Sequence, residues 1–276
     1  MRLLVQLTIL GVPVEIENFS AAQYHKTCGL LDAELLKSQQ VRVGIVKAFQ
    51  HAMGLAPTAN PSDIWHHVIY RHFMDARKGS GSDPHQSWVR AGGDALEIVL
   101  STYYSELLKP HGIRLRVLLG NKQKEEALKA LGCAGKVGKA KLDTVLEGFE
   151  AKEWIPFGGA HIKASMGERV NDDEPTSRAL QARGHFSPLV TMDVKSFPPT
   201  PRVQKDLVNR GEFGSPENPS VKRRYIEENG SFDNCYSFNL RTIPSSGVTP
   251  SGKRIFSLHM DGKEDQFVRD SVKAWK

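Results

Sequence analysis

The chain begins with apolar and polar residues in alternation. Residues 1–20, MRLLVQLTILGVPVEIENFS, place an apolar run before Gly11-Val12-Pro13 and the alternating VEIE after it. A period of two on both sides of a Gly/Pro turn predicts a β-hairpin. The run has no small-residue cleavage site, which argues against a secretory signal peptide.

Between residues 20 and 80 the period changes to three and four. The segments AAQYHKTCGLLDAELLKS and QVRVGIVKAFQHAM repeat apolar residues at this spacing, which predicts amphipathic helices. The stretch NPSD, which starts at residue 60, is a helix-start signal ahead of IWHHVIYRHFMDARK. The linker-like GSGSDP then divides the chain into an N-terminal hairpin and helical module, residues 1–84, and a larger domain, residues 85–276.

The larger domain mixes the two periods. SWVRAGGDALEIVLSTYYSELLKPHGI predicts a long helix with Leu96, Val99 and Leu100 on one face, and IRLRVLLG predicts a strand. KLDTVLEGF and EWIPFGGAHIKAS predict two strands joined by a short turn, PTSRALQAR a helix, and FSPLVTMDVKSF a further strand. The tail is rich in Gly, Pro, Ser and Asn, which predicts loops with short strands such as RIFSLHM. This order predicts a mixed α/β (α+β) fold.

Composition adds a preference for anionic partners. The 276 residues are 39% hydrophobic and 25% charged, as in ordinary globular proteins. Lys and Arg number 37 against 31 Asp and Glu, and the pI of about 9.2 makes nucleic acid a plausible partner. The 3 cysteines form no CxxC pair, so they predict neither a disulfide framework nor a zinc site. No apolar run approaches the roughly 18–20 residues that span a bilayer, so we expect a soluble cytoplasmic protein.

The segment GGAHIKASMGERVNDDEP, residues 158–175, joins an apolar strand to a lysine and a run of charges. Asp143 begins one predicted strand and Lys163 ends the next, so antiparallel pairing would bring them side by side. A carboxylate beside a lysine suits Mg²⁺-dependent phosphodiester hydrolysis, because oxygen ligands hold the hard cation and an ammonium can orient or deprotonate water. The same pair also arises by chance, as a turn-capping aspartate and a surface lysine.

One carboxylate is too few for Mg²⁺, which prefers an octahedral set of oxygen ligands. Glu97, on the helix after GGD, is the best second ligand, and Asp173 and Glu174 are the reserve. Glu97 is otherwise a solvated helix residue. DDEP is otherwise an ordinary helix start, with acids at the positive end and Pro175 at the first helical position.

The motifs SWVRAGGDALE, KLD, HIKASMGERV and MDVKSFPP, in this order and spacing, resemble the type II restriction endonucleases of the PD-(D/E)XK superfamily. The likeness is to the branch that cuts sites with a CCGG core, and it covers most of the chain. It implies a restriction-endonuclease-like core, a mixed central sheet flanked by helices, after a mostly helical N-terminal module. It also implies a Mg²⁺-dependent bacterial enzyme, a type II site-specific deoxyribonuclease acting on double-stranded DNA.

The resemblance also implies the active site. Glu97, Asp143 and Lys163 would form it, with Asp143, Glu97 and Asp173 as candidate metal ligands. His161 stands two before Lys163, where the superfamily usually has a carboxylate. That departure leaves Glu97, Asp173 and the neighbouring glutamate as contenders for the role of the missing acid.

A second lysine competes for the catalytic role. The stretch MDVKS contains Asp193-x-Lys195, a better literal match to (D/E)XK than HIK. The order of the family motifs favours Lys163, and Lys195 is then a structural or phosphate-facing lysine.

DNA reading is expected just after the catalytic lysine. Glu168-Arg169 matches the end of the R-(D/E)-R element with which the branch reads CCGG, although the first arginine of that element is Gly167 here. Arginine can donate to guanine O6 and N7 together, and glutamate can accept from cytosine N4. Arg90 is a candidate contact to phosphate or an outer base, or else a solvated arginine at a helix start. In residues 195–224, the stretch KRRY is a candidate phosphate-contact patch or a solvated charge run.

The leading hypothesis is therefore an endonuclease acting on a palindromic CCGG-containing site. A palindrome is matched by two-fold symmetry, so we expect a homodimer, formed either on the DNA or before it. The resemblance implies ACCGGT, cut after the first A to leave a 5′ CCGG overhang. The alternatives are a sequence-specific DNA-binding protein without cleavage and a PD-(D/E)XK repair nuclease without base specificity.

Overall fold

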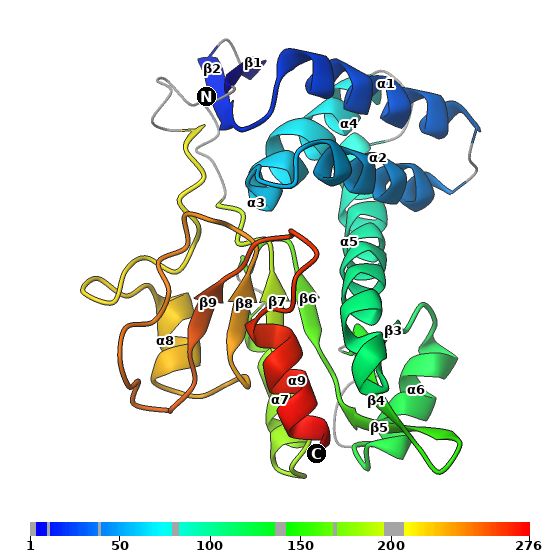
Figure 1. Cartoon of the computed structure of the whole chain (residues 1–276), viewed down its shortest axis with the longest axis vertical. Coiled ribbons are helices and arrows are strands. Elements are labelled where there is room, and N and C mark those ends of the chain that lie inside the picture. Colours follow the sequence, from blue (N-terminus) through cyan, green and yellow to red (C-terminus); the bar gives the residue numbers. More distant parts are fainter. Residues whose placement is uncertain are drawn as a thin grey trace.

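The computed structural model describes residues 4–9, 12–37, 40–78, 83–135, 142–167, 170–195 and 207–276. A hairpin and several helices stand at one end of the molecule, and two sheets with their helices form the other end (Figure 1). Helix α5, Pro84–Leu108, runs between the two ends and packs against both of them. Within the described ranges, no helix is long and apolar enough to cross a membrane.

The predicted N-terminal hairpin is present. Strand β1, Leu4–Ile9, pairs antiparallel with β2, Val12–Glu17, and Val14 and Ile16 point into the core. The helical elements that follow are α1 (Ala21–Lys37), α2 (Val41–Leu55), α3 (Pro61–Asp63), the π-helix η1 (Ile64–Tyr70) and α4 (Arg71–Ala76).

The helix-start signal at residue 60 is confirmed. The Asn60 side chain accepts a hydrogen bond from the Ser62 amide at 3.2 Å, and Pro61 lies in the first turn, where its missing N–H costs nothing. The long helix also begins as its sequence suggests, with Asp83 accepting from the amide of His85 at 2.9 Å. Residues 79–82 of the predicted linker lie outside the described part of the chain, and the division after residue 84 stays a prediction.

The strands form two sheets. The first is antiparallel, in the order β3 (Ile113–Val117), β4 (Thr144–Glu150) and β5 (Glu153–Gly158). The second is parallel, in the order β6 (His161–Lys163), β7 (Leu189–Thr191), β8 (Cys235–Ser237) and β9 (Ile255–Ser257). The other elements beside them are η2 (Lys109–His111), α6 (Asn121–Ala130), α7 (Val170–Gln181), α8 (Val221–Glu227) and α9 (Gln266–Trp275).

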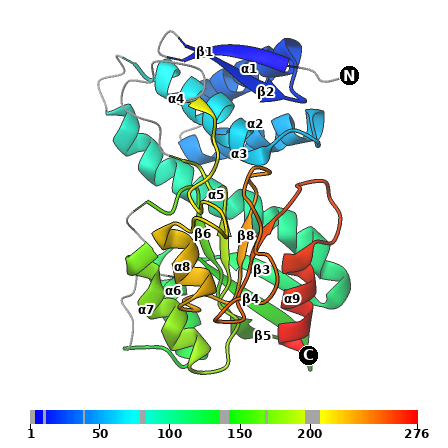
Figure 2. The same cartoon turned by 90° about the vertical axis from the view of Figure 1, so that its left-hand side faces the viewer.

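The parallel sheet has a hydrophobic cluster on each face, because successive strand residues point to opposite sides. Cys235 and Ile255 join Ile226 of α8 in one cluster, while Tyr236 joins Phe267 of α9 in the other. Figure 2 shows the sheet between α7 and α8 on one side and α9 on the other. The expected arrangement, helices flanking a mixed set of strands, is therefore present.

One predicted strand is bent into two. The stretch EWIPFGGAHIKAS pairs with β4 along β5 and then continues into the parallel sheet as β6. The bend falls at Gly159, where the backbone lies so close to its neighbours that a Cβ would stand 2.4 Å from Leu142 Cδ1. The preceding Gly158 is the tighter position, since a Cβ there would stand 2.3 Å from the carbonyl oxygen of Phe186, whereas at Gly159 the Leu142 side chain would have to move. The bend carries the end of the segment from one sheet to the other.

Two predictions for helices were wrong. The tail is not only loops and strands, because α8 and α9 lie in it. Their starts are capped by Ser220, which accepts from the amide of Arg223, and by Asp265, which accepts from the amide of Val268. Helix α7 begins at Val170, whereas the predicted helix began at Pro175. Pro175 therefore lies inside the helix, where its missing N–H leaves one backbone hydrogen bond unmade.

Candidate active site

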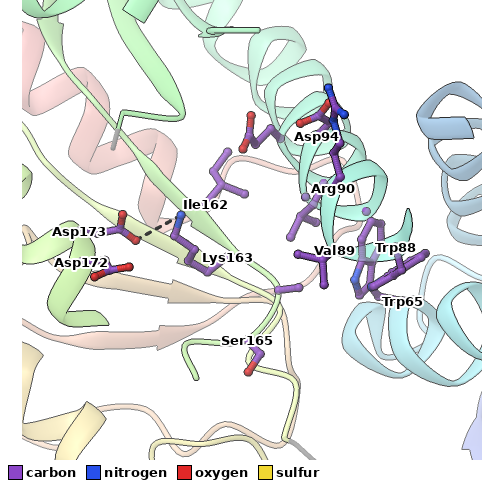
Figure 3. Close-up of a pocket in the computed structure, with 15 residues that line it drawn as sticks. Trp65, Trp88, Val89, Arg90, Asp94, Ile162, Lys163, Ser165, Asp172 and Asp173 are labelled. Carbon is purple, nitrogen blue, oxygen red and sulfur yellow. Dashed lines mark ion pairs between the residues drawn. The ribbon is translucent and has the colours of Figure 1, made fainter. Parts of the chain in front are cut away.

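Four separate elements bring the predicted site residues together. Glu97 lies on α5, Asp143 directly precedes β4, Lys163 ends β6, and Asp173 lies in the first turn of α7. A cavity of about 470 Å³ opens between α5 and the end of β6, lined by Glu97, Lys163 and Asp173 among others. Figure 3 shows Lys163 and Asp173 on the wall opposite Arg90.

Lys163 lies between two carboxylates. Its Nζ is 2.8 Å from Asp143 Oδ2 and 3.2 Å from Asp173 Oδ2. The predicted proximity of Asp143 and Lys163 is thus confirmed, but the predicted antiparallel pairing of their strands is wrong, because β4 and β6 belong to different sheets and the chain bends between β5 and β6. Burial favours the neutral amine, but the charges of Asp143 and Asp173 outweigh it and raise the pKa of Lys163 to about 12. In this arrangement the side chain is therefore an ammonium, which donates to Asp143 at 2.8 Å.

Glu97 is a buried carboxyl group that lies near the carboxylate of Asp143. Burial, and then the charge of Asp143, raises the pKa of Glu97 to about 8, although Lys124 and Lys163 oppose the rise. Two carboxyl groups that share one buried site favour a shared cation. The donor set is all oxygen, which is the type that Mg²⁺ prefers.

The carboxylates of the described residues are not arranged as a complete set of metal ligands. Among the described residues, no group of three or more His, Cys, Asp or Glu side chains is arranged to hold a metal ion. The Lys163 ammonium instead provides the positive charge between Asp143 and Asp173. A metal held by Asp143 and Asp173 would share their oxygens with the Lys163 ammonium.

Lys124 of α6 is a member of this charge cluster that the sequence did not reveal. Its Nζ is 3.9 Å from Asp143 Oδ1, and its side chain is only 17% exposed. It lies in the lysine-rich stretch after β3, where six lysines occur between residues 122 and 141. Their number was visible in the sequence, but nothing in the pattern distinguished the one that faces the site.

His161 replaces the usual carboxylate because its side chain points into the core. It is fully buried, its Nε2 lies 3.2 Å from Ser187 Oγ, and its ring packs edge-on against Phe232. Burial lowers the pKa of His161 to about 4, so the ring is neutral. The charges of Asp143 and Lys163 act on this ring, so position 161 lies next to the charged cluster, but a neutral imidazole stands there in place of the carboxylate.

The two reserve acids on α7 are not equivalent. Asp173 is 4% exposed and pairs with Lys163. Glu174 accepts hydrogen bonds from Ser231 Oγ at 2.8 Å and from Arg178 at 3.2 Å, on a different side of the helix. The structure therefore joins Asp173 to the site and ties Glu174 to a neighbouring loop.

The competing Asp193-x-Lys195 motif forms no such pair. Asp193 is fully buried and accepts from the amide of Glu212 at 2.6 Å and from the hydroxyl of Thr242. Burial raises the pKa of Asp193 to about 7. Lys195 is exposed, and its amide donates to Asn209. Asp193 of the literal motif is thus a buried structural residue that joins neighbouring segments through hydrogen bonds.

The expected DNA contacts divide into three groups. Glu168 and Arg169 lie outside the described residues. Arg90 is exposed on the first turns of α5 and lines the cavity, where a DNA strand could reach it. The KRRY patch is mostly not available to phosphate, because Lys222 pairs with Glu212 and Arg223 is fully buried. The phosphate-contact prediction was wrong for the buried Arg223, because a basic side chain can be buried when it forms an ion pair, here with Glu227.

A scan against protein-family models found no match for the chain. Among curated proteins, it is 44% identical over 265 residues to the type II restriction enzyme AgeI of Thalassovita gelatinovora, with 92% of each chain covered. The chain belongs to the type II restriction endonucleases. It is an enzyme of the site-specific deoxyribonuclease class, as the sequence predicted.

Solved structures agree with this assignment. The fold of this restriction endonuclease is similar to that of AgeI in a specific complex with DNA, with a TM-score of 0.88, 42% identity and 99% of each chain covered. A pre-specific complex of the restriction endonuclease BsaWI with DNA is more distant, at 16% identity and a TM-score of 0.45 over 91% of this chain. The 44% identity to a restriction enzyme sets aside the alternative of a DNA-binding protein without nuclease activity.

Proposed function

We propose that this restriction endonuclease cuts the palindrome ACCGGT after its first A, with Mg²⁺, as a homodimer that places one active site on each strand. The observation that carries the proposal is the Lys163 ammonium held between the carboxylates of Asp143 and Asp173, beside a cavity open to a substrate. The specificity rests on the AgeI-like sequence and on Glu168-Arg169, which suits a C·G pair. A PD-(D/E)XK core is the fold that this arrangement supports.

The carboxylates have one role in this proposal. Asp143, Glu97 and Asp173 would hold Mg²⁺, which when bound supplies a Lewis acid for the scissile phosphate. The raised pKa of Glu97 supports this, because burial and the charge of Asp143 disfavour the Glu97 anion even with Lys124 and Lys163 nearby, and a divalent cation would favour it. Glu97 would lose its proton as the cation binds.

Lys163 has the other role. With a pKa of about 12, Lys163 keeps its proton. It can therefore donate to a phosphate oxygen as negative charge builds on the oxygens of the pentacovalent phosphorane. It can also hold the attacking water in line. Of the two roles considered from the sequence, orientation and proton removal, the first fits its charge.

Recognition is expected to come mainly from the segment after Lys163. Arg169 would donate to guanine and Glu168 accept from cytosine, once in each half-site. Arg90, on the opposite wall of the cavity, would contact the DNA backbone or an outer base.

Two measurements test the proposal. Digestion of a mapped plasmid followed by sequencing of the ends should give cuts only at ACCGGT, with 5′ CCGG overhangs. Asp143→Asn should abolish cleavage while the Kd for an ACCGGT duplex in Ca²⁺ stays measurable. A different recognition sequence would overturn the specificity, and retention of about a tenth or more of wild-type cleavage would remove Asp143 from the site.

A second test concerns the reading residue. Arg169→Ala should weaken binding to the ACCGGT duplex by about 1–3 kcal/mol for each lost guanine contact, and leave binding to a scrambled duplex almost unchanged. Equal weakening of both duplexes would make Arg169 a backbone contact.

A further inference from the structure

Glu212 is a buried carboxylate that no part of the proposed chemistry uses. Its side chain is 8% exposed, and one oxygen, Oε2, accepts two hydrogen bonds from the segment after Lys163. These come from Ser165 Oγ at 3.1 Å and from the amide of Met166 at 2.7 Å. The other oxygen, Oε1, pairs with the ammonium of Lys222 on α8.

The segment that Glu212 contacts directly follows Lys163 at the edge of the candidate site. Residues 164–167 continue the chain from the end of β6, and Ser165 itself lines the cavity. The backbone after β7 also holds this segment, because Val194 donates to the carbonyl of Ala164 at 3.0 Å. Glu212 thus provides the second of two supports.

Glu212 is itself firmly held. Its amide donates to Asp193, which is the buried carboxylate of the literal Asp-x-Lys motif. Gly211, the residue before it, has a φ of +75°, and a Cβ there would lie 2.1 Å from Asp193 Oδ2. Glycine adopts this φ without strain, so the turn can approach Asp193 closely, and the next side chain, Glu212, reaches Ser165 and Met166.

We propose that Glu212 is a positioning residue, which fixes residues 164–167, the residues that lie in the sequence between Lys163 and the Glu168-Arg169 pair, and thereby positions Lys163 at the cavity. This inference rests on the proposed function, and it adds a specificity-determining residue outside the recognition element. A carboxylate is suited to the task because one oxygen can accept two hydrogen bonds while the other is neutralised by Lys222.

Glu212→Ala removes the support. With enzyme in saturating excess over the ACCGGT duplex, the single-turnover rate should fall by about 100-fold, because small displacements of reacting groups have effects of that size. In EDTA, without any metal, the preference for the ACCGGT duplex over a scrambled one should narrow about tenfold. The active fraction, taken from the burst amplitude, corrects for misfolded protein.

The double variant Glu212→Gln/Lys222→Met separates the loop support from the ion pair. The glutamine carbonyl can still accept from Ser165 and Met166, and the lysine that needed a negative partner is gone. We expect its rate and its binding preference to lie within about fivefold of wild type. Glu217→Ala, an exposed glutamate on the same segment, is the matched control and should match wild type.

The outcomes are distinct. A Glu212→Ala protein with a lower melting temperature but a normal rate per active molecule and a normal binding preference would overturn the inference, since the role would be structural only. A double variant as defective as Glu212→Ala would also overturn it. Failure of the wild-type enzyme to cut ACCGGT would instead remove the proposed function, before any variant is compared.

Discussion

The chain contains two aspartate–lysine motifs, and the structure puts them to opposite uses. Asp143 and Lys163 come from different strands, touch at 2.8 Å, and lie next to a cavity with Glu97 and a further lysine. Asp193 and Lys195 are separated by one residue in the sequence but do not pair, because neutral donors satisfy the aspartate inside the protein. A carboxylate becomes available for chemistry when its partners are charged and displaceable, and becomes structural when amides and hydroxyls hold it. The short motif does not carry this difference.

The largest effect expected from this comparison is between the two lysines. Lys163→Ala should lower the cleavage rate by about 100- to 10,000-fold, the range for loss of a group that donates in the transition state. Lys195→Ala should stay within about twofold of wild type, because its side chain is exposed and away from the carboxylates. Single-turnover cleavage of one labelled duplex measures both. Loss of activity in the second variant alone would reverse the assignment.

The next effect separates neighbouring acids. Asp173→Ala should cost about 10- to 100-fold in cleavage, because Lys163 loses a partner and the metal a ligand. Glu97→Ala should cost at least as much. Glu174→Ala should reduce cleavage only a few-fold, since its contacts are Ser231 and Arg178. If the Glu174 variant were as impaired as the Asp173 variant, the proposed assignment of Asp173 rather than Glu174 as a metal ligand would be wrong.

The third effect is a pH dependence that only the charged site should show. Glu97 must lose its proton to bind Mg²⁺, and its pKa is about 8, so the half-saturating Mg²⁺ concentration should fall about tenfold per pH unit from 6 to 8. Glu97→Gln should flatten this slope. In the metal-free protein, the same titration lowers stability as pH rises from 4.5 to about 8, because the unfolded chain ionises first. An unchanged slope in Glu97→Gln would assign the proton to another group.

The smallest effect tests the structural aspartate. Asp193→Ala should lower the free energy of unfolding by about 1–3 kcal/mol, because the Glu212 amide and the Thr242 hydroxyl lose their acceptor. The wild-type pKa of about 7 lies above the ordinary 3.8, so the wild type itself loses stability as pH rises between these values. The deficit of the variant, measured in urea, should therefore shrink from pH 4 to pH 7. A constant deficit would mean that Asp193 does not titrate in this range.

The sequence predicted what depends on local patterns and on neighbouring strands. The hairpin and the capped helix at Asn60 follow from periodicity and capping residues. The proximity of Asp143 and Lys163 was predicted, but it arises across two sheets and not from the pairing of their own strands. Pattern did not reveal the bend at Gly159, which arises from a close approach to Leu142 in another segment.

Contacts across long stretches of chain were also out of reach. Lys124 lies on a helix whose rotation about its axis is set by packing, and Glu212 meets its loop after more than forty residues. Composition misled the interpretation of the tail, because a majority of small and polar residues concealed two short capped helices. The caps at Ser220 and Asp265 were the signals that could have located them.

The ammonium between Asp143 and Asp173 has a consequence for handling the enzyme. A small zinc domain unfolds when a chelator removes its ion, because nothing else neutralises its ligands. Here the chain carries its own positive charge to that place, so the folded state does not depend on metal supply. Purification and storage in EDTA should leave the melting temperature unchanged, with the enzyme intact and inactive until divalent ions are returned.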